Sequence, residues 1–254
     1  MEIPSDRLDG RHAMVTGAGR GIGRACALAL AKAGAAVTAV ARTREEVESV
    51  AAEIEAAGGR AWARPVDVTE EAAVEALVAE ANAKLPLSIL TTAAGTNRTG
   101  PASSYPTADW DLLMSVNVRG TFLACRAVGR EMLERGSGGR IVTMSSQMGA
   151  VGYPGRAAYC ATKHAINGLT KALAVEWAPE GITVNAVAPT FVETPLTRPM
   201  FEDRNFAAEV RRRTPGGEIA SVGDVASAVL YLASDRAAAV TGHILAVDRG
   251  WTAW

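Results

Sequence analysis

Tyr159 and Lys163 lie four residues apart in the segment YCATK. In a helix, this spacing places both side chains on one face, about one turn apart. A free tyrosine has a pKa of about 10, which is too high for ready proton exchange at neutral pH. A lysine ammonium about 5 Å away, at an effective dielectric constant of about 20, favours tyrosinate by roughly 3 kcal/mol, or about two pKa units. The pair therefore predicts an acid–base tyrosine whose pKa is lowered by its neighbour.

A glycine-rich segment, TGAGRGIG, runs from Thr16 to Gly23 between a predicted strand and a predicted helix. Its glycines let the backbone turn sharply and approach a pyrophosphate, and the helix N-terminus offers free N–H groups. A tight turn without a ligand is the alternative. The position after the first strand of an alternating chain favours a dinucleotide site. The residues expected to bind the cofactor here are Gly17, Gly19, Arg20, Gly21, Ile22 and Gly23.

Short β-branched segments alternate with long alanine-rich segments along the chain, which predicts a parallel sheet covered by helices on both faces. The predicted strands are 12–16, 36–41, 60–66, 88–92, 139–145, 183–188 and 244–247. The predicted helices are 21–33, 43–57, 69–84, 107–135, 157–178 and 220–233. We expect the third helix to begin at Thr69, and Gly34, Gly58 and Gly136 to end the helices that precede them.

The fold class expected is α/β, a single doubly wound Rossmann-like domain over residues 1–254 with a seven-stranded parallel sheet. No repeat or Pro/Gly linker divides the chain. The segment 194–217 is rich in Pro and Arg and has weak periodicity. In a doubly wound sheet such a segment often lies over the carboxyl ends of the strands, so we expect it to form a substrate lid.

Composition argues against several classes of partner. The net charge is −1 and the arginines are scattered, so nucleic acid and anionic membranes are not expected partners. The chain start lacks a basic region followed by an apolar run, and the apolar stretch 25–41 is too short and interrupted to span a bilayer. Cys26, Cys125 and Cys160 are widely spaced, which predicts reduced thiols, no metal site and a cytoplasmic protein.

Further motifs occur in a fixed order: Asp67-Val68, Ala93-Ala94-Gly95, Asn117, Ser145-Ser146, Asn185-Ala186-Val187-Ala188-Pro189, Thr194 and Val247-Asp248-Arg249-Gly250-Trp251. Together with the two motifs above, they resemble the short-chain dehydrogenase/reductase family over nearly the whole chain. The resemblance implies hydride transfer between a nicotinamide cofactor and a ketone or secondary alcohol.

The resemblance also implies a catalytic tetrad. Asn117 matches the asparagine that bends its helix and holds a water. Ser146, thirteen residues before Tyr159, matches the serine that binds the substrate oxygen, whereas Ser145 is better explained as a strand-end hydroxyl that bonds to the backbone. Tyr159 matches the acid–base group, and Lys163 its neighbour, which also bonds the nicotinamide ribose. The remaining cofactor-binding residues implied are Asp67, Val68, Ala94, Gly95, Pro189, Val192 and Thr194, together with Asn117, Tyr159 and Lys163.

The residues at the end of the second strand indicate whether the protein prefers NAD(H) or NADP(H). Relatives that prefer NAD carry an acidic residue there, which bonds the ribose diol. Here the strand ends with 39–41, which holds no carboxylate, and Arg42 follows directly. A guanidinium can hold a 2′-phosphate with paired hydrogen bonds, and Arg20 can approach the same group. The expected cofactor is therefore NADP(H), with NAD(H) as the alternative.

Two alternatives to a carbonyl reductase or alcohol dehydrogenase are open. The chain could be a dinucleotide-binding sensor or scaffold, although such a protein would be expected to lose Tyr159 or Lys163. The substrate could also be a 3-oxoacyl thioester, a sugar, a sugar acid or a steroid. Carrier-protein reductases often carry a basic residue before the Gly-Ile-Thr turn, and this chain has Glu180 there.

The expected substrate pocket is lined by Thr96, Asn97, Arg98, Gln147, Met148, Tyr153, Thr190, Phe191 and the lid. Three positions depart from the family pattern. At the first, Thr92 and Ala93 replace two asparagines, and at the second, Thr190 replaces a glycine and is expected to narrow the site. Arg249 also replaces a glycine, which would cost stability if that position requires a positive φ. The family further implies a homotetramer or dimer built on the helices 107–135 and 157–178.

Overall fold

A seven-stranded parallel sheet forms the centre of the protein, for which the computed structural model describes residues 4–253. The strands are β1 (His12–Thr16), β2 (Ala36–Ala41), β3 (Ala61–Pro65), β4 (Ile89–Thr92), β5 (Gly139–Met144), β6 (Ile182–Pro189) and β7 (Ile244–Val247). Their order is β3-β2-β1-β4-β5-β6-β7, and every neighbouring pair is parallel. The predicted doubly wound α/β fold is confirmed. The strand order reverses between β1 and β4, where such sheets bind ligands.

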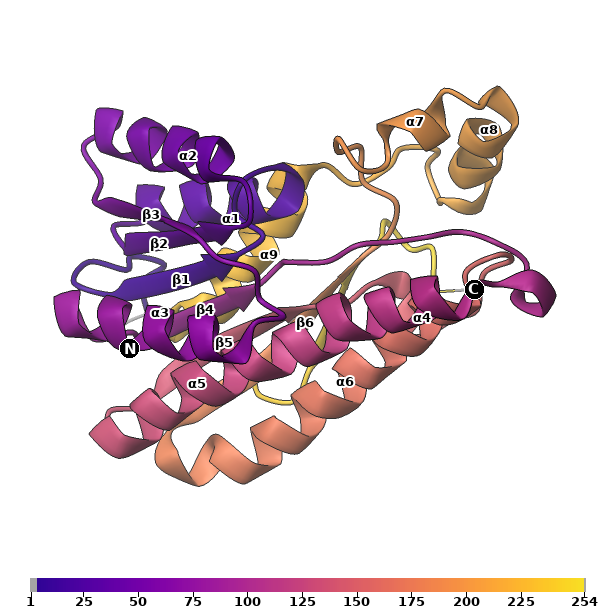
Figure 1. The fold of residues 1–254 in the computed structure, drawn as a ribbon. Helices are drawn as coiled ribbons and strands as arrows, with labels where there is room; N and C mark the ends of the chain where they lie inside the picture. The colour runs from indigo at the N-terminus through magenta and orange to yellow at the C-terminus, as the bar shows by residue number, and fades with distance from the viewer. Residues whose placement is uncertain (1–3, 254) are drawn as a thin grey trace.

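Helices cover both faces of the sheet (Figure 1). They are α1 (Gly21–Lys32), α2 (Arg44–Ala56), α3 (Glu71–Lys84), α4 (Thr107–Leu113), α5 (Gly120–Arg135), α6 (Ala157–Trp177), α7 (Arg198–Phe201), α8 (Arg204–Arg213) and α9 (Val222–Ala233). Buried side chains of α1, α2 and α9 pack on one face, and those of α3, α5 and α6 on the other. None of the helices within residues 4–253 combines the length and apolar character needed to cross a membrane.

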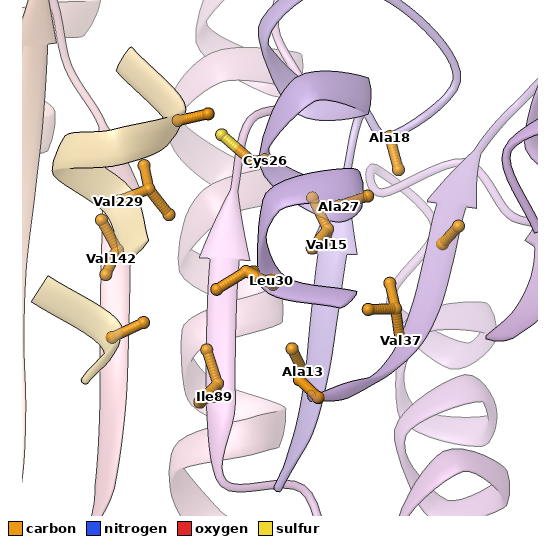
Figure 2. Packing of buried hydrophobic residues seen from close by; sticks show 14 of the residues in the cluster. Ala13, Val15, Ala18, Cys26, Ala27, Leu30, Val37, Ile89, Val142 and Val229 are labelled. Carbon is orange, nitrogen blue, oxygen red and sulfur yellow. The ribbon is translucent and has the colours of Figure 1, made fainter. Parts of the chain in front are cut away.

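The core under α1 holds that helix against the sheet (Figure 2). Leu30 and Cys26 are fully buried and belong to one cluster with Val15 of β1 and Val229 of α9. Burying a side chain such as Leu30 contributes about 1.5–3 kcal/mol. Because the residues facing α1 include alanines such as Ala13, the helix can pack close to β1 and hold the intervening glycine turn in place.

Two local predictions need correction. The helix α3 begins two residues later than expected, because the backbone N–H and hydroxyl of Thr69 both donate to Asp67 Oδ1, at 2.9 and 2.8 Å. The predicted helix 107–135 consists of α4, a π-helical turn over Met114–Arg119, and α5. Gly34, Gly58 and Gly136 do follow helix ends with positive φ, as predicted.

The expected lid region contains more regular structure than its sequence indicates. It includes α7 and α8, and the Asp203 carboxylate caps α8 by accepting from the N–H groups of Asn205 and Phe206. Figure 1 shows this orange segment at the end of the molecule toward which the strands point. Side chains of the segment, among them Val210, pack with Phe191 and Trp251 in an aromatic cluster. The segment is therefore anchored to the end of β6 and to the C-terminal part of the chain.

Candidate cofactor site and active site

The glycine turn between β1 and α1 leaves its backbone accessible at the sheet's reversal point. Gly17 has a φ of 68°, and a Cβ there would lie 2.6 Å from the Ala93 backbone. A Cβ on Gly23 would lie 2.1 Å from the Gly17 carbonyl oxygen. No side chain caps the N-terminus of α1. The free N–H groups and the positive end of the helix dipole are suited to a pyrophosphate.

A cavity of about 240 Å³ lies over this turn. It brings together most of the predicted cofactor residues: Gly17, Gly19, Arg20, Gly21, Ile22, Gly23, Arg42, Asp67, Val68, Ala94, Gly95 and Thr194. Pro189 and Val192, with the tetrad residues, lie outside its lining. The cavity is also lined by residues that were not assigned to the cofactor: Ala41, Thr43, Glu46, Val66, Ala93, Thr96, Val116, Pro195 and Leu196. Of these, Thr96 was expected in the substrate pocket, and Pro195 and Leu196 in the lid. These residues could have been found from the sequence because most of them lie next to a predicted strand end or helix start.

Charges of both signs line the cavity beyond β2. The Arg20 and Arg42 side chains are 63% and 70% exposed, so both can reach a ligand. Each has an acidic neighbour: Arg20 lies 3.8 Å from Glu46, and Arg42 lies 3.9 Å from Asp67. These distances make weak, exposed ion pairs. The arginines are therefore available to a phosphate, while the carboxylates oppose it.

Asn117 lies in the π-helical turn and is buried. Its Oδ1 accepts from the Thr96 N–H at 2.8 Å, and its Nδ2 donates to the Thr96 carbonyl at 2.9 Å. Nδ2 also lies 3.2 Å from the Thr162 hydroxyl of α6. The side chain thus ties the loop after β4 to the helix that carries Tyr159. Asn117 therefore lies both in the π-helical turn and at the contact between the loop after β4 and α6.

Ser146 follows β5 and faces Tyr159. Its hydroxyl accepts from the Met148 N–H at 3.2 Å and lies 3.5 Å from the Pro189 carbonyl. Ser145 instead donates to Asn167 Oδ1 at 2.6 Å. Ser145 therefore has a structural partner, as expected, but the partner is a side chain rather than the backbone.

Lys163 is buried beside Tyr159, with its Nζ 5.5 Å from the tyrosine ring centroid. The ammonium donates to the Met144 carbonyl at 2.7 Å. Burial lowers the pKa of Lys163 to about 8. Burial also raises the pKa of Tyr159 to about 12, although the Ser146 hydroxyl and the Arg156 charge act to lower it. The predicted lowering of the tyrosine pKa is therefore wrong for the protein alone, because desolvation outweighs the nearby charges.

Four of the expected substrate residues divide into two groups. Met148, Tyr153 and Phe191 belong to the aromatic cluster, in which Phe191 and Trp251 have ring centroids 5.6 Å apart. Arg98 is exposed, lies 3.9 Å from Asp109 and bonds a neighbouring carbonyl, so it has partners elsewhere. The sequence interpretation missed a second type of residue in this region, the buried guanidinium of Arg156, which lies three residues before Tyr159.

Residues 17–252 match the family described as enoyl-(acyl carrier protein) reductase. D-threitol dehydrogenase of Mycolicibacterium smegmatis is 40% identical over 97% of this chain and 94% of its own. This chain belongs to the short-chain dehydrogenase/reductase family. Galactitol 2-dehydrogenase (L-tagatose-forming) of Cereibacter sphaeroides is 44% identical over 98% of this chain and 97% of its own.

A solved gluconate 5-dehydrogenase from Burkholderia cenocepacia, in complex with NADP and tartrate, superposes with a TM-score of 0.95. It is 38% identical and covers 99% of both chains. The resemblance inferred from the motifs is confirmed. The chain is thus an NAD(P)-dependent oxidoreductase of small alcohols and ketones.

Proposed function

We propose that this protein interconverts a ketone and a secondary alcohol with NADP(H), using Asn117, Ser146, Tyr159 and Lys163. The observation that carries the proposal is the cluster formed where β5 and α6 meet. The Ser146 hydroxyl and the buried Lys163 ammonium both lie beside Tyr159. Asn117 of the same tetrad bonds Thr96, which lines the cofactor cavity. Hydroxyl, acid and cation are the groups that carbonyl chemistry requires.

A bound nicotinamide supplies or accepts the hydride. Ser146 donates a hydrogen bond to the substrate oxygen, where negative charge develops during reduction. Tyr159 remains protonated at neutral pH because its pKa is about 12, so it is ready to deliver a proton to that oxygen. Lys163 is held by the Met144 carbonyl and stabilises the tyrosinate that forms. Asn117 keeps the loop after β4 against α6.

Arg42 and Arg20 support NADP(H) as the preferred cofactor. Both line the cavity just beyond β2, and their acidic neighbours lie at distances that leave the guanidinium groups available. Thr43 lines the same region and precedes α2, whose N-terminus has no side-chain cap. A 2′-phosphate there would meet two cations, a hydroxyl and free N–H groups.

The substrate class is best described as a hydroxylated carbon chain. Dehydrogenases of threitol, galactitol and gluconate are among the relatives that match nearly the full length. The lid 194–217 contributes Met200, Phe201 and Phe206 to the wall beside Tyr159. The proposed enzyme therefore acts on polyols or sugar acids rather than on carrier-bound acyl chains.

An activity assay tests the proposed function. Wild-type protein is incubated with NADP⁺ and a panel of alditols and aldonates, and with NADPH and the corresponding ketoses and keto acids. A Tyr159→Phe variant should lose about 10²–10⁴-fold in kcat, since a positioned acid–base group contributes this much. Tyr231→Phe makes the same chemical change on the exposed face of α9 and serves as the control. Retention of most activity in Tyr159→Phe would refute the assignment.

We also infer a homotetramer or dimer. Exposed apolar side chains lie on the helices expected to form the contact: Trp110 on α4, Phe122 on α5 and Val175 on α6, the last 80% exposed. Covering such side chains is favourable at a subunit interface. Light scattering at micromolar concentration measures the assembly, and a monomer would contradict the inference.

A further inference from the structure

Arg156 carries a buried guanidinium that lacks an acidic partner. The residue is 6% exposed. Within residues 4–253, no Asp or Glu lies within ion-pair distance of it, and its Nη1 has no hydrogen-bond partner. The contact of its Nη2 is the Met200 sulfur, 3.6 Å away, which is a weak acceptor. Other arginines of the chain, such as Arg126 and Arg140, form ion pairs with carboxylates.

Burying the charged guanidinium of Arg156 without a carboxylate partner costs free energy. Burial without a counter-charge or full hydrogen bonding disfavours the ionised form, and the pKa of Arg156 is lowered by desolvation. An arginine nevertheless stays protonated, because its ordinary pKa lies far above neutrality. Three tyrosines that face it, Tyr105, Tyr153 and Tyr159, have raised pKa values because of burial and are neutral at pH 7, so they supply no negative charge. The guanidinium therefore needs an anion that the described chain does not supply.

Arg156 lies at the active site, so the anion that it needs would bind there. It immediately precedes α6 as the N-cap residue and stands three residues before Tyr159. Its charge is close enough to act on the pKa of Tyr159. Met200, which it contacts, belongs to α7 of the lid. An anion held by Arg156 would lie between the acid–base group and the lid.

Three more buried polar groups without partners flank the same centre. Gln147 follows Ser146, and neither amide atom is bonded. Thr190 follows Pro189, the carbonyl of which contacts the Ser146 hydroxyl, and its own hydroxyl is unbonded. Asn97 follows the residue that bonds Asn117, and its Oδ1 is unbonded. Because buried polar groups are generally satisfied, these suit a ligand that carries several hydroxyl groups.

We propose that Arg156 binds the carboxylate of a polyhydroxylated acid, so that the preferred substrates are sugar acids rather than neutral polyols. The planar fork of the guanidinium matches a carboxylate through two parallel hydrogen bonds. The unbonded amide and hydroxyl groups of Gln147 and Thr190 bind the substrate hydroxyls. This proposal rests on the oxidoreductase function above and adds a specificity residue to it.

The kinetic experiment compares pairs that differ in one carboxylate, such as D-gluconate with D-glucitol and L-threonate with L-threitol. In the wild type, kcat/KM should favour the acid of at least one pair. Arg156→Gln should lower that acid-to-alditol ratio about 10- to 150-fold, in line with a charge-assisted hydrogen bond. Arg156→Lys keeps the charge without the fork and should retain part of the ratio. Arg60→Gln removes an exposed arginine beside β3 and should leave it unchanged.

A binding measurement makes the proposal independent of turnover. Calorimetric titration of the NADP⁺-bound protein with gluconate, threonate and L-tartrate should show binding that weakens at least tenfold in Arg156→Gln. If Arg156→Gln does not fold, the comparison is made with Arg156→Lys. An unchanged ratio and unchanged affinity in the variant, or wild-type preference for the alditol of each pair, would overturn the proposal. Absence of turnover with carboxylate binding intact would instead refute the oxidoreductase function.

Discussion

Replacing Arg42 with Ala tests how the protein selects its cofactor. The Arg42 side chain is 70% exposed, lines the cavity after β2 and lies 3.9 Å from Asp67. An exposed pair at that distance contributes about 0–1 kcal/mol, so turning the guanidinium toward a phosphate loses little. The substitution removes the proposed phosphate ligand without leaving a buried charge, because Asp67 also accepts from the Thr69 N–H and hydroxyl.

The magnitude follows from the type of bond that is lost. A hydrogen bond to a charged group contributes about 1.5–3 kcal/mol, which corresponds to about a 10- to 150-fold change in kcat/KM. NADH has no 2′-phosphate, so its kcat/KM should change only a few-fold. The ratio of kcat/KM for NADPH over NADH, measured with one accepted ketone, should therefore fall by at least tenfold in Arg42→Ala.

Two further variants sharpen the cofactor test. Arg44→Ala removes an arginine two residues later that pairs with Glu48 and does not line the cavity, so it should leave the ratio unchanged. Glu46→Gln removes a carboxylate from the cavity wall and frees Arg20, so it should raise the ratio. A wild-type ratio below one would refute the preference for NADP(H). An unchanged ratio in Arg42→Ala would show that the phosphate is bound by other residues.

The remaining predictions concern stability. The native pKa of Lys163 is about 8, below its ordinary 10.5, so between these values the unfolded chain binds a proton that the native state does not. Stability of the wild type relative to Lys163→Met should thus rise with pH across that window, by about 3 kcal/mol. Denaturant titrations of both proteins at several pH values measure the difference, and a flat difference would contradict the buried lysine. Arg249 has a φ of 53°, as its replacement of a family glycine suggested, and pairs only weakly with Glu218 and Asp224. Arg249→Gly should be more stable than Arg249→Ala by about 1 kcal/mol, because only glycine relieves the left-handed backbone. Equal thermal midpoints for the two variants would show that φ carries no cost there.

The parts of the structure that follow from local sequence were predicted well. The strands and most helices lie within one or two residues of the expected ranges, because β-branched runs, alanine-rich segments and glycine stops act over short distances. The glycine turn was predictable for the same reason. Its spacing between a strand and a helix already specifies a backbone that can approach a phosphate.

The features that the sequence did not reveal depend on contacts between distant segments. The π-helical turn at Asn117 is stabilised by bonds to Thr96 and Thr162, which lie 21 and 45 residues away. The helix α8 lies in a segment with weak periodicity and is fixed by its Asp203 cap and its packing on the aromatic cluster. Nothing in the sequence around Arg156 distinguishes it from an exposed arginine in a loop. Only the packing of the lid around it shows that it is buried and lacks a carboxylate.

The tyrosine–lysine pair shows why spacing alone gives the wrong resting pKa. Four residues of separation predict the distance, and the ammonium does lie 5.5 Å from the ring centroid. Spacing says nothing about desolvation, which lowers the pKa of Lys163 to about 8 and raises that of Tyr159 to about 12. At pH 7 the lysine is therefore charged and the tyrosine protonated. This is the state that reduction of a ketone requires: the proton is present at the start, and the cation stabilises the tyrosinate once the proton has left.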